Sequence, residues 1–302
     1  MKKHLLAIVI VTSFLSVSFA QQNLPLAQLA KSAPGISLPE APLPSERGAA
    51  LSHINSVHNT WDPAAPFSYY QKPAKLAAGA GVTLENVRWG RTPADHKSFS
   101  WKTVRINPDL IEKVIYGYKT FGTGHTLLIF VFKEGGVTDS RGATARVLTF
   151  GAEAWAREPY GYTLSHAFEG RYPLIWSATT FESYADYVVG FTKMEIFFRN
   201  MNISRAQTLR LFELLMARID ETNRNHEVYN MLSNSCTNNN VGLVNQVLLK
   251  NQRIPLESSG MINPSAAIPV LAVKQYEKMG VLRPEIFRVG LDNYKHFDIL
   301  KI

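Results

Sequence analysis

The segment HTLLIFVF, from His125 to Phe132, is the feature that most constrains the fold of this chain. Its apolar residues run without interruption from Leu127 to Phe132, and the segment ends at Gly135-Gly136. A short continuous apolar run between turn residues is typical of a buried strand. We therefore expect a sheet that buries this strand.

Other segments predict further strands and helices. RVLTFGAEAWARE reads as a second strand and the hairpin partner of the first, and TKMEIFFRNMN reads as a third. Asn107-Pro108-Asp109 predicts the start of a short helix that continues to about Tyr118. Ser204 and Gln207 form a capping-box pattern. The helix that follows would carry on one face the apolar residues Leu209, Phe212, Leu215, Met216 and Ile219.

The order of these elements favours an α+β fold. Strands and helices are mixed without the regular alternation of a doubly wound parallel sheet. We divide the 302 residues into three parts. Residues 1–20 (MKKHLLAIVIVTSFLSVSFA) predict a secretory signal peptide that is cut before Gln21. Residues 21–58 are rich in Pro and Ala and predict an arm or linker, and residues 59–302 form a single domain.

Charge and motifs narrow the classes of partner. Cleavage removes two of the 32 Lys and Arg residues, which against 24 Asp and Glu lowers the net charge from +8 to +6. This surplus suits anionic phospholipid, or is simply a soluble surface. Export argues against nucleic acid as a partner. We find no G-x-S-x-G elbow, P-loop, H-E-x-x-H or Cys/His metal spacing, so neither a cofactor nor a metal is expected.

Cys236 is the single cysteine of the chain. An exported protein that needed disulfides would carry pairs, so this thiol is bonded to another molecule, buried and inert, or reactive. The apolar spacing after it predicts a helix from about Cys236 to Lys250, with Asn234 or Ser235 as N-cap. A helix N-terminus stabilises a thiolate and offers amide donors to an oxyanion. We expect Asn234, Ser235 and Thr237 to serve this capping and oxyanion region.

A reactive thiolate also needs a base and a group that orients the base. Among the eight histidines, His125 is the best candidate because it opens the apolar strand after Gly122-Thr123-Gly124. A structural histidine is the alternative. Glu153 is a lone carboxylate on the second apolar strand and predicts the third member. It could instead pair with Arg146 or Arg157 on a solvated face, and Asp139 is an alternative third member in what looks like an exposed turn.

With His, Glu and Cys in this order, the sequence resembles a bacterial envelope domain family linked to lipoprotein N-acyl transfer. That family is a circularly permuted relative of the papain-like NlpC/P60 and lecithin–retinol acyltransferase enzymes. Its strand opened by histidine is matched by HTLLIFVF, and its serine-x-glutamate strand by FGAEAWARE, with Gly151 in place of serine. Its motif Y-N-x-L-x-N-N-C-T-x-N is matched by YNMLSNSCTNN, with Ser235 in place of asparagine. The resemblance covers about residues 100 to 250.

The resemblance implies a permuted papain-like domain, with an antiparallel sheet packed on helices and a catalytic Cys236 at a helix N-terminus. It implies an acyltransferase at the periplasmic membrane surface, with a phospholipid as acyl donor and the N-terminal amine of a lipoprotein as acceptor. Three alternatives stay open: an NlpC/P60-type cell-wall peptidase or amidase, a phospholipase, and a non-catalytic envelope binding protein.

Overall fold

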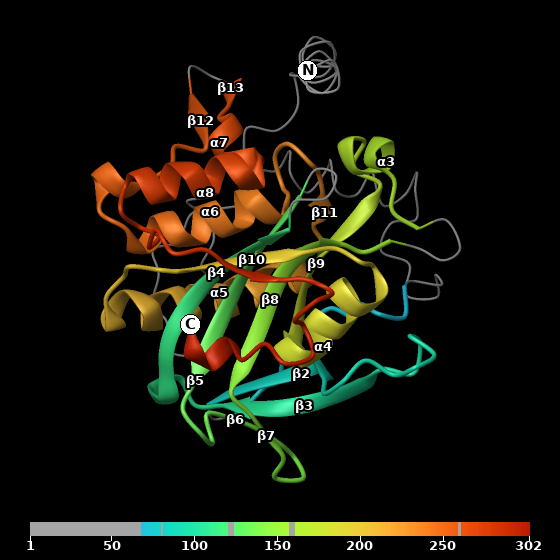
Figure 1. Cartoon of the computed structure of the whole chain (residues 1–302). Coiled ribbons are helices and arrows are strands. Elements are labelled where there is room, and N and C mark those ends of the chain that lie inside the picture. Colours follow the sequence, from blue (N-terminus) through green and yellow to red (C-terminus); the bar gives the residue numbers. More distant parts are fainter. Residues whose placement is uncertain (1–67, 80, 120–123, 157–160, 259–260) are drawn as a thin grey trace.

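The computed structural model describes residues 68–79, 81–119, 124–156, 161–258 and 261–302 (Figure 1). The expected signal peptide and the expected arm lie outside the described residues, as do residues 59–67 of the expected domain. Of the helices in the described ranges, none combines the length and the apolar character that a membrane crossing requires.

The described strands form one large sheet of 12 strands and a separate small hairpin. The order along the large sheet is β14-β10-β4-β5-β8-β9-β2-β3-β6-β7, with β1 paired to β2 and β11 paired to β9. Neighbouring strands are antiparallel, apart from the parallel pair β2 and β9. The bounds are β1 Lys75–Leu76, β2 Val82–Trp89, β3 Ser100–Ile106, β4 Ile111–Lys119, β5 His125–Phe132, β6 Val137–Asp139, β7 Thr144–Ala145, β8 Val147–Ala154, β9 Tyr172–Thr180, β10 Ile196–Asn200, β11 Val228–Tyr229, β14 Phe287–Val289, and for the hairpin β12 Glu257–Ser258 and β13 Met261–Ile262.

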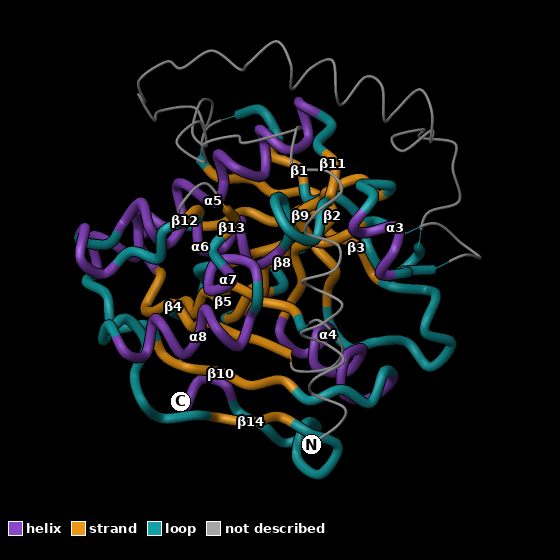
Figure 2. Tube along the Cα trace, turned by 90° about the horizontal axis from the view of Figure 1, so that it is seen from above, coloured by secondary structure: helices purple, strands orange, loops and turns teal. Residues whose placement is uncertain are grey.

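Helices cover both faces of this sheet (Figures 1 and 2). On one face lie α5, α6 and α8, and on the other α4 packs together with the C-terminal segment. The bounds are α3 Leu164–Phe168, α4 Phe181–Ala185, α5 Arg205–Asn225, α6 Cys236–Val247, α7 Pro264–Ala267 and α8 Pro269–Lys278, with a π-helical turn at Asp186–Phe191 and 3₁₀ turns at Pro108–Leu110, Lys250–Gln252 and Ile299–Lys301. The α+β class is therefore confirmed.

Strand β5 is buried over its whole length, as predicted. Alternate side chains of a strand point to opposite faces. Leu128, Phe130 and Phe132 pack in the core cluster beneath α5 and α6. Their neighbours Leu127, Ile129 and Val131 pack in the second cluster, with α4 and the C-terminal segment. A sheet with two covered faces explains why this strand is apolar without alternation.

The prediction of a helix from Asn107 to about Tyr118 is wrong. The Asn107 side chain does accept the Asp109 amide, but only one 3₁₀ turn follows before β4 begins at Ile111. The segment is rich in β-branched and aromatic residues, which favour a strand. It pairs with β5 on one side and β10 on the other, and this tertiary pairing overrides the local helix signal.

The remaining element predictions are confirmed, with one change in connectivity. The strand expected in TKMEIFFRNMN is β10, and α5 begins with the capping box between Ser204 and Gln207. Strand β8 is the antiparallel neighbour of β5, as expected. The two do not form a simple hairpin, because β6 and β7 lie between them in the chain and β6 pairs with β3.

Candidate active site

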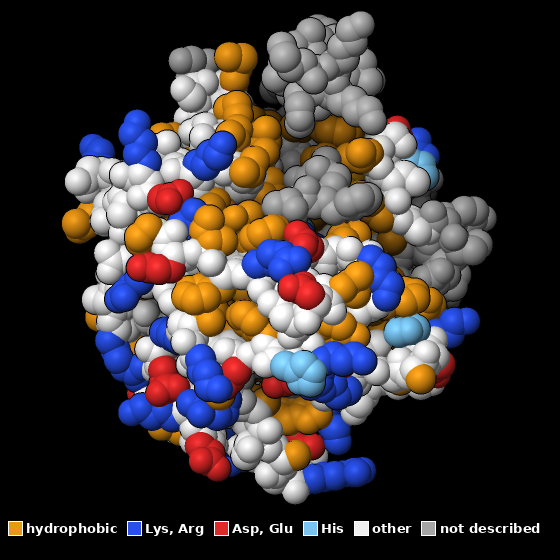
Figure 3. Space-filling view, viewed as in Figure 1, with side chains coloured by type: hydrophobic (Ala, Val, Ile, Leu, Met, Phe, Trp, Pro, Cys, Tyr) orange, Lys and Arg blue, Asp and Glu red, His pale blue; other side chains and the backbone are white. Residues whose placement is uncertain are grey.

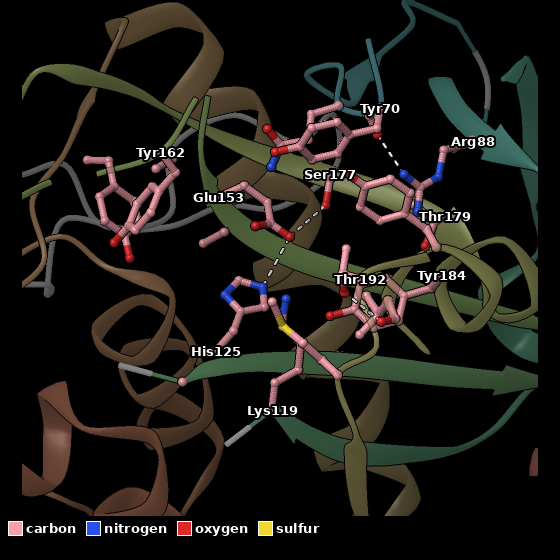
Figure 4. Close-up of a pocket in the computed structure, with 18 of the residues that line it drawn as sticks. Tyr70, Arg88, Lys119, His125, Glu153, Tyr162, Ser177, Thr179, Tyr184 and Thr192 are labelled. Atoms are coloured by element: carbon pink, nitrogen blue, oxygen red, sulfur yellow. Dashed lines mark hydrogen bonds and ion pairs between the residues drawn. The ribbon is translucent and has the colours of Figure 1, made fainter. Parts of the chain in front are cut away.

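Five neighbouring strands place polar side chains on one face of the sheet, the face covered by α4. They are Lys119 from β4, His125 from β5, Glu153 from β8, Thr179 from β9 and Arg88 from β2. The register aligns Lys119 with His125 and Arg88 with Thr179. All five line a cavity of about 470 Å³ (Figure 4). The strand order thus brings residues from distant parts of the sequence into one site.

His125 and Glu153 are in direct contact inside this cavity. Nε2 of His125 lies 3.1 Å from Oε1 of Glu153, and the two side chains are 10% and 18% exposed. Ser177 lies on the other side of the same carboxylate oxygen, with its hydroxyl 3.5 Å away. Gly151 leaves room for the contact, because a Cβ atom there would stand 2.8 Å from Oε1 and 3.0 Å from Nε2.

The electrostatics of the pair favour its charged form. Burial opposes the charge of Glu153, but the charge and hydrogen bond of His125 and the charges of Lys119 and Arg88 outweigh it, and the pKa of Glu153 falls to about 2. Burial also opposes the charge of His125, but Glu153 and Cys236 together raise the pKa of His125 to about 9. At neutral pH the contact therefore joins an imidazolium to a carboxylate.

Cys236 is the first residue of α6, and the His125 side chain lies close enough to its thiol to influence the ionisation of that thiol. Burial opposes thiolate formation, but the charge and hydrogen bond of His125, the Thr126 amide and the Thr237 hydroxyl outweigh it, and the pKa of Cys236 falls to about 7. The Thr237 hydroxyl lies 3.7 Å from Sγ. The structure therefore brings together the three residues that the sequence predicted, with His125 in contact with both Cys236 and Glu153.

The thiol lies at the edge of the cavity. Cys236 is 3% exposed and packs in the core cluster on the α5 and α6 side of the sheet. It is not among the described residues that line the cavity, but its charge raises the pKa of two of them, His125 and Tyr229. His125 therefore links the thiol to the cavity.

Asn234 and Ser235, the two residues before Cys236, have different roles in the structure. Ser235 is the N-cap of α6: its hydroxyl accepts the Asn238 amide and its own amide donates to the Asn238 side chain. Asn234 is not the cap. Its side-chain amide donates to Glu227 and to the Val228 carbonyl, both at 3.0 Å. Asn234 therefore braces the loop that leads into the helix.

A buried polar network, which the sequence did not reveal, fixes the start of α6. Arg218 of α5 and Glu227 form an ion pair with both side chains 1% exposed. Arg218 also donates to Asn239 at 2.9 Å, and Asn239 donates to Asn234 at 2.9 Å. In addition, the Asn240 side chain donates to the Thr126 hydroxyl at 2.9 Å, which ties α6 to β5 beside His125. The signal for this network was the run of asparagines in an apolar helix, because buried amides need partners.

The alternatives for the acidic residue are not supported. Asp139 lies on β6 and is buried, where it accepts the amides of Arg141 and Ala143 and lies 3.3 Å from Lys102. The prediction that Asp139 lies in an exposed turn is therefore wrong. Its carboxylate binds these groups at β6 instead of orienting His125. Arg146 pairs with Glu112 rather than with Glu153, and Arg157 lies outside the described residues.

The cavity also contains two cationic side chains that the sequence analysis missed, Arg88 and Lys119. Neither belongs to a recognisable motif in its strand, so only the fold reveals its place. In the described ranges, no group of three or more His, Cys, Asp or Glu side chains is arranged to hold a metal ion.

No curated protein and no solved structure matches the chain. The family described as the Lnb N-terminal periplasmic domain matches residues 100–269. This segment is more than half of the 302 residues and includes His125, Glu153 and Cys236. The chain therefore belongs to the Lnb N-terminal periplasmic domain family.

Proposed function

We propose that this chain is a periplasmic cysteine acyltransferase that moves an acyl chain from a phospholipid to the N-terminal amine of a lipoprotein. One observation carries the proposal: the His125 side chain contacts both the Cys236 thiol and the Glu153 carboxylate. This is the arrangement of nucleophile, base and orienting group that thiol acyl transfer needs.

In the first half of the proposed reaction, the Cys236 thiolate attacks the carbonyl carbon of a phospholipid ester. A C–S bond forms, and the tetrahedral oxyanion collapses with cleavage of the ester C–O bond. His125 gives its proton to the departing lysophospholipid oxygen. The first amides of α6 are donors for the oxyanion, since Ser235 caps the Asn238 amide and the helix itself does not use those of Cys236 and Thr237.

In the second half, the lipoprotein amine attacks the thioester carbonyl. A C–N bond forms, the C–S bond breaks, and His125 takes the proton of the amine, which restores the imidazolium–thiolate pair. Glu153 holds the imidazole in one orientation through both halves. The burial of Cys236 limits access of water, which favours transfer to an amine over hydrolysis and over a peptidase with an open polar cleft.

Two further observations support the finer parts of the proposal. The Cys-bearing helix α6 packs on β5 and β8 but follows both in the chain, as a permuted papain-like arrangement requires. Apolar side chains gather over α7 and α8 in Figure 3, where Ile268 and Val270 are exposed. Between them, Pro269 packs against Gly124, next to His125. This apolar rim suits peripheral contact with a membrane surface.

Mass spectrometry tests the proposal. The full chain is incubated with vesicles of phosphatidylethanolamine, and we expect an acyl adduct on Cys236. The adduct is absent in Cys236→Ser and falls by about 100-fold or more in His125→Ala. His296→Ala is the matched control, because that histidine is exposed and lies outside the cavity. Turnover of muropeptides without any acyl adduct would contradict the transferase and support the peptidase.

A further inference from the structure

The charge of the cavity is not balanced by its own residues. The charged side chains among its described lining residues are Arg88, Lys119, His125 and Glu153. Between about pH 7 and pH 9, the pKa values of Cys236 and His125, the two side chains together hold one proton and are neutral as a pair. Glu153 then offsets one of the two remaining cations, so the site retains one net positive charge. A buried charge is costly without a partner.

Lys119 is the cation best placed to meet a ligand. It lies opposite His125 in the register of β4 and β5 and lines the cavity. Its ammonium stands 5.9 Å above the ring of Tyr184, and it forms no ion pair with a residue that the structure describes. Burial lowers the pKa of Lys119, with the charge of Glu153 opposing it. An anion in the cavity would stabilise this ammonium.

Arg88 supplies a fixed second charge. Its side chain is 3% exposed and is held by the Ser183 hydroxyl at 3.1 Å and the Tyr70 carbonyl at 2.7 Å. Its guanidinium also lies 5.2 Å from the ring centre of Tyr187. These contacts fix the group in place, so it contributes charge without having to reorient.

Two hydroxyl groups beside these cations have no hydrogen-bond partner in the described part of the chain. The hydroxyls of Thr179 and Tyr184 are buried and form no hydrogen bond with the described residues, although both residues line the cavity. In Figure 4, Arg88, Thr179 and Tyr184 lie together to the right of His125 and Glu153. Buried hydroxyls nearly always find an acceptor, and an anionic oxygen is the strongest one available.

We propose that Lys119, Thr179 and Tyr184, supported by Arg88, form a subsite for a phosphodiester, the headgroup phosphate of the acyl donor. A phosphodiester carries one negative charge, which matches the one unbalanced positive charge, whereas a neutral glyceride or an uncharged peptide does not. The subsite lies beside the Cys–His–Glu group, so it would hold the ester carbonyl of a phospholipid near Cys236. The inference rests on the proposed function, because that function makes a phospholipid the donor.

Binding to the Cys236→Ala protein tests the subsite without any chemistry. Dihexanoyl phosphatidylethanolamine, dihexanoylglycerol and inorganic phosphate are each titrated below the micellar range by calorimetry. We expect the phospholipid to bind most tightly and Lys119→Met to weaken it by about tenfold or more. Lys119→Arg keeps most of the affinity. Lys133→Met is the matched control, since that exposed lysine follows the far end of β5, about 26 Å from His125.

Tyr184→Phe removes a single hydroxyl and tests the subsite even if Lys119→Met fails to fold; we expect several-fold weaker binding of the phospholipid. The subsite is overturned if Tyr184→Phe and Lys119→Arg both bind the phospholipid as tightly as the parent does. Where Lys119→Met folds, it would then also bind the phospholipid as tightly as the parent. Phosphate binding as tight as phospholipid binding would overturn its assignment to a lipid headgroup. If the phospholipid binds through Lys119 but never acylates Cys236 in the unaltered chain, the proposed function fails while the subsite stands.

Discussion

At the scale of single residues, His125 controls the ionisation of Cys236. Burial by itself would raise the pKa of the thiol, and the charge and hydrogen bond of the imidazolium are the main opposing effects that bring it to about 7. The same two residues are coupled to Glu153, so the three side chains ionise as one unit. The reactivity of the thiol is therefore a property of the group.

The pH dependence of alkylation tests this control. We expect the rate of Cys236 modification by iodoacetamide to rise with a midpoint near pH 7, the pKa of the thiol. In His125→Gln the midpoint should move upward, because burial is then opposed only by neutral hydrogen bonds. The rate at neutral pH should fall about tenfold or more. An unchanged midpoint in His125→Gln would show that the helix N-terminus alone, and not His125, sets the pKa.

At the scale of elements, the N-terminus of α6 is the piece that positions the thiol. Its capping box between Ser235 and Asn238 has a counterpart at the start of α5, between Ser204 and Gln207. The two caps satisfy the same kind of amide, but only the first holds Cys236. This pair separates the effect of a cap on stability from its effect on the site.

We expect Ser235→Ala and Ser204→Ala each to lower the free energy of unfolding by about 1 kcal/mol, as measured by urea denaturation. Only Ser235→Ala should also slow the alkylation of Cys236 in the folded protein, because the loss of that cap frees the first turn of α6. Equal alkylation rates in the two variants would contradict a positioning role for the cap.

At the scale of the whole molecule, the His125–Glu153 pair links stability to pH. The pKa of Glu153 is lowered from 4.5 to about 2, so its contribution is present above about pH 4.5 and is lost as the pH falls towards 2. The pKa of His125 is raised from 6.5 to about 9, so its contribution is present below about pH 6.5 and is lost as the pH rises through 9. The pair stabilises the fold fully between these limits.

Glu153→Gln should therefore destabilise the protein more at about pH 5.5 than at about pH 3 or pH 10. The measurement is the free energy of unfolding in urea at the three pH values, with Cys236→Ala as the background so that the thiol does not titrate. Glu213→Gln is the control, because its pair with Arg210 is exposed and should contribute little at any pH. A constant difference between parent and Glu153→Gln across the range would refute the linkage.

Much of the secondary structure could be predicted because its signals are local. The apolar run of β5, the capping box of α5 and the start of α6 at Cys236 each depend on a few adjacent residues. The error at β4 has the opposite origin. Asn107 and Pro108 do start a helical turn, but pairing with β5 and β10 makes the rest of the segment a strand. The sequence of a single segment does not show which other strands it will pair with.

The sequence by itself determined the chemistry available at the site: one cysteine at a helix N-terminus, a histidine at the head of a buried strand and a lone acid on another strand. Only the tertiary structure decided which groups meet. The register of the strands places Glu153 against His125, and the Arg218–Glu227 network and Asn240 dock α6 so that Cys236 reaches the imidazole. The same register adds Lys119 and Arg88 to the cavity. These contacts join residues far apart in the chain, and their geometry follows from packing, which local sequence signals do not encode.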